Sequence, residues 1–400
     1  MPNSFVVKNK GIKTYLNSNF SICRQTQTEW PNGPVLKETG SIIGKYNIPS
    51  RIFTFLCFAG FVQTSNEKRK TLKCWPLLHF LLLFAVIDYF LMTILSFEPF
   101  MLKVNSAFLL AMILILVICF SMRRARRRLT ILILKLQYLQ PSPKEKMFDL
   151  LILILFLIQV ALGVACTITA DKDISTDFAY GKELKSHWVR LMLIFFKEFL
   201  LLLISPFLPC LVALVYCTIC LRCSRFVRNM THKISLYSPE QFGPSEQIRI
   251  LRHKAKIDEI LKIAQDIFSV PSFCLMLANT ISCYTTLGCY LLTPLQVYQL
   301  MGYSVTGIIS FLCLVGTLWV AGALPVELNN LKGTFYEKVY LRCIFFGFHK
   351  EQSLWREILE KPDFVFSGCD ILFYKRSSIL AAVGTLVTYT VLVINVQESH

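Results

Sequence analysis

Apolar residues gather in runs that are long enough to cross a lipid bilayer, and polar loops separate these runs. A membrane-spanning helix needs roughly 20 mostly apolar residues. Seven stretches meet that condition, at about 75–96, 101–121, 148–170, 190–221, 267–293, 299–323 and 372–396. Backbone groups in lipid must be hydrogen-bonded within their own segment, so each run is expected to be a helix. The pattern predicts an all-α membrane protein with seven transmembrane helices.

Positive charge lies almost entirely on one side of these runs. Most of the 42 Lys and Arg residues fall in 1–74, 122–147, 222–266 and 324–376. The opposite loops hold only Lys103, Lys172, Lys182, Lys185 and Arg190. Because short loops rich in Lys and Arg stay in the cytosol, we expect a cytosolic N-terminus and, with seven spans, an extracellular C-terminus. The same loops, lying beside anionic lipid, explain the formal charge of +17 without nucleic acid as a partner.

The segments on the basic side are long enough to form structure of their own. Residues 1–74 form a cytosolic N-terminal region, and the short apolar segment 48–63 within it is expected to lie at the inner interface or to re-enter the membrane. Residues 245–266 repeat apolar side chains with helical spacing and predict an amphipathic helix. The span at 190–221 is longer than a bilayer core, so it must tilt, kink at its prolines or project into the cytosol.

Three ionisable residues lie inside the predicted spans, namely Asp88, Lys197 and Glu198. A charge in the membrane is costly and needs a partner or water. Neighbouring residues of a helix do not face each other, so Lys197 and Glu198 must find separate partners. We expect an ion pair between Asp88 and Lys197.

The sequence offers no catalytic or metal-binding constellation and implies no cofactor. The 15 cysteines are scattered, and most lie in apolar runs, where free Cys packs as a small hydrophobe. Cys217, Cys220 and Cys223 are spaced by three, but zinc would need a fourth ligand at a fixed spacing. Packing is the simpler interpretation, with reversible acylation as an alternative. A disulfide between Cys166 and Cys289, near the outer helix ends, is left open.

The last span carries a mixed stripe. On a helix, Thr388, Leu392, Asn395 and Ser399 share one face, and Val396 flanks it. Alternating polar and apolar groups suit a narrow pore with a hydrophobic constriction and a polar ring. Alternatively, the Thr and Asn side chains satisfy each other or a neighbouring helix.

This span also carries a motif. Thr388-Tyr389 is followed by five residues and then Asn395-Val396. The pattern resembles the arthropod gustatory receptor family, which is related to the insect olfactory receptors and has Thr-Tyr, five apolar residues and Gln-Phe in its last span. The preceding stretch 366–380 is similar to the family's approach to that span. Asn in place of Gln, Val in place of Phe and a polar Thr390 are the departures.

The resemblance implies a tastant-gated, non-selective cation channel in the plasma membrane of sensory neurons, built as a homo- or heterotetramer. The last helix, in 372–400, would line the pore, and 324–371 would form a cytosolic anchor with the inner helix ends. Carried over by position, Leu392 and Val396 would form the gate for permeant cations, and Asn395 would line the pore.

A ligand pocket in the outer half of the bundle would need aromatic walls and a few polar groups. Such side chains gather near the outer helix ends. The candidate ligand contacts are Gln159, Trp188, Thr286, Tyr290 and Tyr303. The alternative is an aromatic belt at the outer interface, where Trp and Tyr gather in any membrane protein.

Two other classes of membrane protein are alternatives. A G-protein-coupled receptor would have the opposite orientation, with Asp-Arg-Tyr after the third span and Asn-Pro-x-x-Tyr in the seventh, and neither motif occurs. Glycosylation at Asn19, in an Asn-Phe-Ser sequon, would favour that class because it places the N-terminus outside. A transporter is less favoured because no internal repeat is evident.

Overall fold

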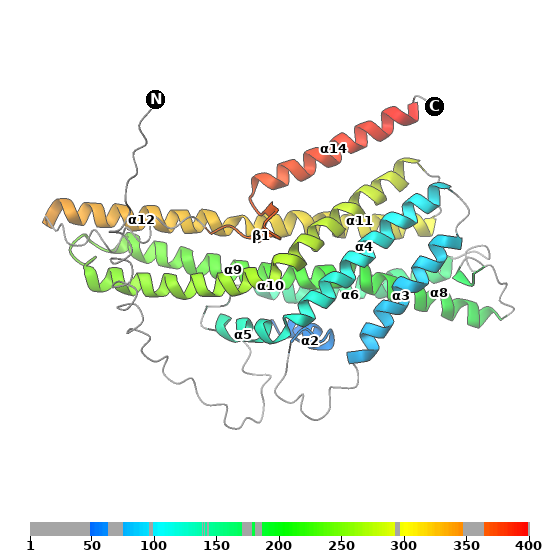
Figure 1. The fold of residues 1–400 in the computed structure, drawn as a ribbon, viewed down its shortest axis with the longest axis horizontal. Coiled ribbons are helices and arrows are strands. Elements are labelled where there is room, and N and C mark those ends of the chain that lie inside the picture. Colours follow the sequence, from blue (N-terminus) through cyan, green and yellow to red (C-terminus); the bar gives the residue numbers. More distant parts are fainter. Residues whose placement is uncertain are drawn as a thin grey trace, which may run out of the picture. The chain divides into compact units, whose positions relative to one another are not determined.

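The computed structural model describes residues 49–62, 75–95, 99–137, 139, 141, 144–169, 178–180, 186–292, 297–346 and 364–398. Over these ranges the regular secondary structure is helical apart from one short two-stranded hairpin (Figure 1). In chain order the elements are α2 (Ser50–Phe58), α3 (Trp75–Leu95), α4 (Pro99–Arg124), α5 (Arg126–Leu136), α6 (Lys144–Thr169), α8 (His187–Leu202), η4 (Leu203–Phe207), α9 (Leu208–Leu236), α10 (Pro244–Leu292), α11 (Val297–Ala321), α12 (Ala323–Phe346), β1 (Ser367–Gly368), β2 (Leu372–Phe373) and α14 (Ser377–Glu398). Much of the predicted N-terminal region 1–74 and part of the predicted anchor 324–371 lie outside the described residues.

Several helices are long and apolar enough to cross a membrane, which agrees with a multi-pass membrane protein. Within the described ranges six helical stretches qualify, namely Leu102–Arg124, Glu145–Thr169, His187–Leu236, Pro244–Leu292, Gln299–Phe346 and Ser377–Asn395. Residues Phe80–Leu95 of α3 form a shorter apolar helix. A seventh span at α3, and the orientation of the termini, stay predictions.

Helix α10 joins two segments that the sequence pattern separates. The amphipathic stretch 245–266 and the predicted span that follows it lie in one continuous helix of 49 residues, which ends at Leu292. At 1.5 Å per residue it is about 70 Å long, more than twice a bilayer core. Its contacts with α4, α9 and α11 make it the central helix of the described fold.

The span predicted at 190–221 is interrupted rather than continuous. Helix α8 ends at Leu202, the turn η4 follows, and α9 begins at Leu208. Ser205 has non-helical backbone angles immediately before Pro206. Proline has no N–H to donate and disfavours helical geometry in the residue before it. Of the three alternatives expected for this span, a kink is present, at Pro206.

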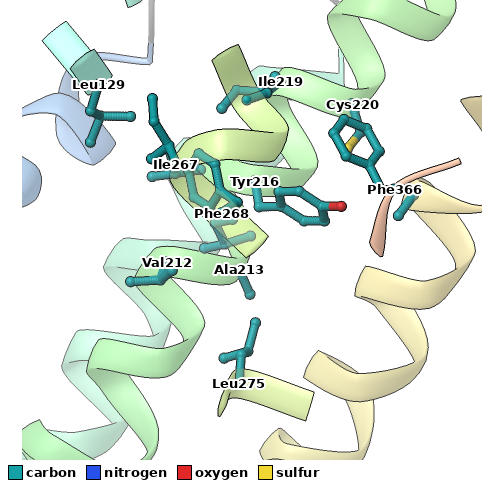
Figure 2. Close-up of a cluster of buried hydrophobic side chains, with 14 of the residues drawn as sticks. Leu129, Val212, Ala213, Tyr216, Ile219, Cys220, Ile267, Phe268, Leu275 and Phe366 are labelled. Atoms are coloured by element: carbon teal, nitrogen blue, oxygen red, sulfur yellow. The ribbon is translucent and has the colours of Figure 1, made fainter. Parts of the chain in front are cut away.

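An aromatic cluster occupies the core where α9 and α10 meet the hairpin. The fully buried Tyr216 ring lies 5.3 Å from the Phe268 and Phe366 rings and 6.2 Å from the Tyr374 ring, measured between centroids. Figure 2 shows Tyr216 between Phe268 and Phe366. Rings at such separations and angles add attraction beyond burial alone. The cluster packs the hairpin onto the bundle.

Hydrogen bonds fix the same hairpin to α10. The Gln265 amide donates to the Ser367 carbonyl at 2.8 Å, and the Ser367 N–H donates back to Gln265 Oε1 at 3.2 Å. The Tyr374 hydroxyl donates to Ser272 Oγ at 2.8 Å. A Cβ on Gly368 would lie 2.5 Å from the Tyr374 hydroxyl, so this close approach requires glycine.

The start of α14 is also held by the junction of α11 and α12. Gly322 lies between these helices, and a Cβ there would come within 2.7 Å of the Arg376 backbone nitrogen. Arg376 also places its guanidinium over the Trp319 ring of α11, at 4.9 Å from the ring centroid. The last helix is therefore anchored at its first turn.

The expected interfacial segment 48–63 contains the short helix α2, which packs against α6 and α9. Ile52 and Leu56 are buried. The Asp149 carboxylate of α6 accepts the N–H groups of Arg51 at 2.8 Å and of Ile52 at 3.1 Å. These are free donors of the first helical turn, so the acid caps α2 from another helix.

A buried ion pair joins α9 to the beginning of α6. Arg222 is fully buried, and its Nε and Nη2 donate to the two carboxylate oxygens of Glu145 at 2.8 and 2.5 Å. Arg222 Nη1 also donates to the Leu136 carbonyl at the end of α5, at 3.2 Å. The guanidinium thus connects α5, α6 and α9.

We expect Arg222→Ala to lower the free energy of unfolding by about 3–5 kcal/mol, because it leaves the Glu145 carboxylate buried and unpaired. The measurement is thermal or denaturant unfolding of the purified protein in detergent. The double variant Arg222→Met/Glu145→Met should recover much of the loss, since no charge remains unpaired.

The matched control is Arg249→Ala, which removes an exposed Arg from its pair with Glu246 and should change stability little. Equal losses in the Arg222 and Arg249 variants would contradict a special role for the buried pair.

Candidate functional site

Helix α14 lies outside the helical bundle. None of the residues in its most apolar 18-residue stretch is buried in the single chain, and among the described elements its main contacts are with α10 and α11. Figure 1 shows it, in red, at one edge of the fold, running in much the same direction as the last part of α10. An apolar helix this exposed must be covered by lipid or by another protein chain.

The predicted stripe faces away from the bundle. Thr388 and Asn395 are exposed, and the Leu392 side chain is 58% exposed. The Thr388 hydroxyl donates to the Gly384 carbonyl at 2.9 Å, so its hydrogen bond is made within α14. Val396 lies in α14, but its side chain is outside the described set.

Tyr389 points in another direction and holds α14 against α10. Its ring meets the Tyr284 ring edge-to-face, with centroids 4.8 Å apart. A Cβ on Gly288 would lie 3.0 Å from the Tyr389 hydroxyl, so glycine makes room for this contact. The family motif thus divides into an exposed Thr388 and a Tyr389 that contacts the bundle.

The predicted ion pair between α3 and α8 is confirmed. Lys197 Nζ lies 2.8 Å from Asp88 Oδ1, and both side chains are more than 90% buried. Lys197 also donates to the Phe178 carbonyl at 2.9 Å and lies 4.2 Å from the centroid of the Tyr180 ring. The Tyr180 hydroxyl donates to Asp88. Phe178 and Tyr180, which lie between α6 and α8 in the sequence, therefore contact the ion pair that joins α3 to α8.

A second group of polar and aromatic residues lies near this ion pair, and of its members the sequence predicted only Tyr303 as a ligand contact. The Tyr89 hydroxyl donates to Asn105 Oδ1 at 3.2 Å, which joins α3 to α4. The Phe108 ring of α4 stacks on the Tyr303 ring of α11, with centroids 5.7 Å apart. The Tyr89 side chain lies near Tyr303 and near Glu198 of α8. We call Tyr89, Asn105, Phe108, Glu198 and Tyr303 the polar–aromatic cluster.

The other predicted ligand residues are dispersed. Tyr290 is 43% exposed and shares a hydrogen bond with Ser304. Trp188 is 74% exposed, with its ring edge against His187. Such exposure near a helix end is typical of an interfacial aromatic belt.

Gln159 and Thr286 are buried between helices. As far as the described residues go, neither amide atom of Gln159 has a hydrogen-bond partner, and the Thr286 hydroxyl has none either. Thr286 lies where α10 and α11 come close, because a Cβ on Gly307 would be 2.8 Å from its methyl group. Buried unsatisfied polar groups cost free energy unless water or a ligand binds them.

The two cysteines near the outer helix ends are not joined by a disulfide. Cys166 and Cys289 are both buried thiols. In the described part of the chain no cluster of His, Cys, Asp or Glu could hold a metal ion.

The fold is similar to solved structures of an insect olfactory receptor. The insect olfactory receptor OR5 from Machilis hrabei matches 86% of this chain and 97% of its own, with a TM-score of 0.69 and 14% sequence identity. The same receptor in complex with eugenol matches 87% of this chain and 97% of its own, with a TM-score of 0.68 and 15% identity. No family model and no curated sequence matches the chain. The chain has an insect olfactory receptor-like fold.

Reversing the ion pair tests its role in holding α3 to α8. We expect Asp88→Lys and Lys197→Asp each to abolish most cell-surface expression, because each leaves two like charges buried together. The double swap should restore expression in part, since it recreates a pair. Surface labelling gives the measurement, and Lys103→Asp on the exposed side of α4 is the control. A double swap as poor as the single variants would argue against the pairing.

Proposed function

We propose that this chain is a chemosensory receptor of the gustatory type that works as a ligand-gated, non-selective cation channel. Four copies, either identical or from related subunits, surround a central pore lined by α14. Two independent lines support this: the Thr388-Tyr389 motif resembles gustatory receptors, and the fold is similar to that of an insect olfactory receptor. A small-molecule tastant is the proposed ligand, and the plasma membrane is the proposed location.

The exposure of α14 is the observation that carries the proposal. The hairpin attaches the helix firmly at its start, yet none of its apolar 18-residue stretch is buried. A helix that served only to complete the bundle would bury one face against its own chain. Exposure on this scale is what a helix would need in order to meet copies of itself around an axis.

The stripe on α14 supplies the parts of a gate. In the proposed tetramer, four Leu392 side chains and four Val396 side chains form the apolar constriction. Four Asn395 side chains form a polar ring between them. A narrow apolar ring excludes water and blocks ions until the helices separate. Because Asn is one methylene shorter than Gln, the Asn395 ring would be wider than a Gln ring at the same place.

The proposed ligand site lies at the end of the bundle where Phe178 and Tyr180 meet α3 and α8, which we assign to the extracellular side. The polar–aromatic cluster brings together residues of α3, α4, α8 and α11 there. Of the predicted contacts, Tyr303 belongs to it, while Gln159 and Thr286 offer unsatisfied polar groups. Aromatic walls with a few polar groups are typical of small-molecule sites.

The decisive experiment is electrical recording from the purified protein in lipid bilayers, where no G protein is present. We expect some members of a panel of sugars, bitter compounds and amines to evoke cation currents. Sodium and potassium should permeate similarly. Ligand responses that require added G protein, or a protein that remains monomeric in native mass measurements, would refute the channel.

The gate assignment is tested by Leu392→Ser. We expect a current without ligand, because a hydroxyl hydrates the constriction that Leu392 keeps dry. The control is Val393→Ser, which lies in the same turn of α14 but points about 100° away from Leu392. Basal currents are compared at equal surface expression. A Leu392→Ser channel that stays closed would remove Leu392 from the gate.

A further inference from the structure

Two neighbouring pairs of residues connect α3 and α8. Asp88 and Tyr89 are consecutive in α3, and Lys197 and Glu198 are consecutive in α8. Asp88 and Lys197 form the buried ion pair at 2.8 Å, and Tyr89 and Glu198 lie near each other. Because consecutive residues of a helix point about 100° apart, the ion pair aligns the two helices and turns Glu198 away from Lys197.

This arrangement leaves Glu198 without a counter-charge among the described residues. Lys197 is engaged by Asp88, by the Phe178 carbonyl and by the Tyr180 ring. The Glu198 side chain is half-buried, and neighbouring parts of the protein shield its carboxylate from solvent. In the described ranges it has no hydrogen bond or ion pair. A carboxylate that lies inside a membrane protein and has no partner costs free energy, and it marks a functional site by default.

Glu198 lies near Tyr89 of α3 and Cys166 of α6, and further aromatic rings adjoin Tyr89. Tyr89 is its neighbour on α3, and Tyr303, stacked on Phe108, interacts with the same Tyr89. Tyr89, Phe108 and Tyr303 are each only half-buried, so part of each ring remains accessible. Ring faces attract cations, and the attraction grows when water is excluded.

From this setting we propose that Glu198 recognises ligands that carry a protonated amine, with the carboxylate as the ion-pair acceptor and the rings of Tyr89, Phe108 and Tyr303 enclosing the organic part. The inference rests on the proposed function and names the ligand class of the same site.

The hydrogen-bonding groups of the cluster favour an amine over a polyol such as a sugar. A polyol needs several free donors and acceptors to replace its water shell. Here the Tyr89 hydroxyl already donates to Asn105. Glu198 is the only acid of the polar–aromatic cluster, and it lies beside accessible ring faces, which matches one cationic group attached to an apolar body.

The test compares ligands that differ only in charge. Phenethylamine, tryptamine and quinine serve as amines, and phenethyl alcohol and indole-3-ethanol serve as neutral counterparts of the first two. Binding is measured on the purified receptor by thermal shift and by calorimetry. We expect at least one amine to bind the wild-type protein more tightly than its neutral counterpart. Glu198→Gln should weaken that amine about 10- to 100-fold, the usual effect of a charge-assisted bond, and leave the neutral ligands within about twofold.

Two further variants keep the result interpretable. Glu198→Asp retains the charge and should preserve the preference for amines, even if Glu198→Gln folds poorly. Glu240→Gln removes an exposed carboxylate between α9 and α10 and should change nothing. The proposal is overturned if no amine binds the wild-type protein, or if Glu198→Gln weakens amines and neutral ligands alike.

The binding assay also separates this inference from the channel. Loss of amine binding in Glu198→Gln, in a protein that passes no current, would support the ligand class and reject the channel. Amine binding that is unaffected by Glu198→Gln, in a protein that conducts, would support the channel and reject Glu198 as the residue that recognises amines.

Discussion

The attachment of the β1–β2 hairpin to α10 is the constraint on which the rest of the structure depends. Gln265 of α10 exchanges hydrogen bonds with Ser367 of β1. The Tyr374 hydroxyl, immediately after β2, donates to Ser272 of α10. These contacts tie the approach to the last helix to the longest helix of the described fold. Because α14 is fixed at its first turn, touches α10 through Tyr389 and buries none of its apolar 18-residue stretch, that stretch must be covered from outside the chain. Under the proposed function, this exposure would let α14 meet its copies around a shared pore.

Two ion pairs hold the helices around this base in register. Arg222 and Glu145 join α9 to α6 at one level, and Lys197 and Asp88 join α8 to α3 at another. Buried pairs of this kind tolerate little sliding, because a shift of one residue would leave two charges unpaired. The polar–aromatic cluster depends on the second pair, since the alignment that brings Lys197 to Asp88 also brings Glu198 towards Tyr89.

The sequence predicted the features that follow from periodicity or from the cost of charge in a membrane. Helical spacing alone put Thr388, Leu392 and Asn395 on one face, and that face is exposed. The cost of burying Asp88 and Lys197 predicted their pairing. The sequence did not reveal contacts between residues far apart in the chain, such as those within the polar–aromatic cluster or between the hairpin and α10. Such contacts depend on how the helices cross, and spacing along one helix carries no information about that. The continuity of α10 was missed because its composition changes from amphipathic to apolar near residue 267, while the helical backbone does not break.

One turn of α10 lies between the two proposed functional regions. Tyr284 and Gly288 contact Tyr389 of α14, and Cys289, the next residue, lies near both Tyr389 and Tyr89 of the polar–aromatic cluster. Consecutive helix positions point about 100° apart, so this turn can present one side to the cluster and another to the last helix. Under the proposed function, a ligand that changes the packing around Tyr89 acts on the same backbone that supports Tyr389. Because α14 is fixed at its start and otherwise unburied in its own chain, a small displacement at Tyr389 would move the exposed stripe that forms the proposed gate.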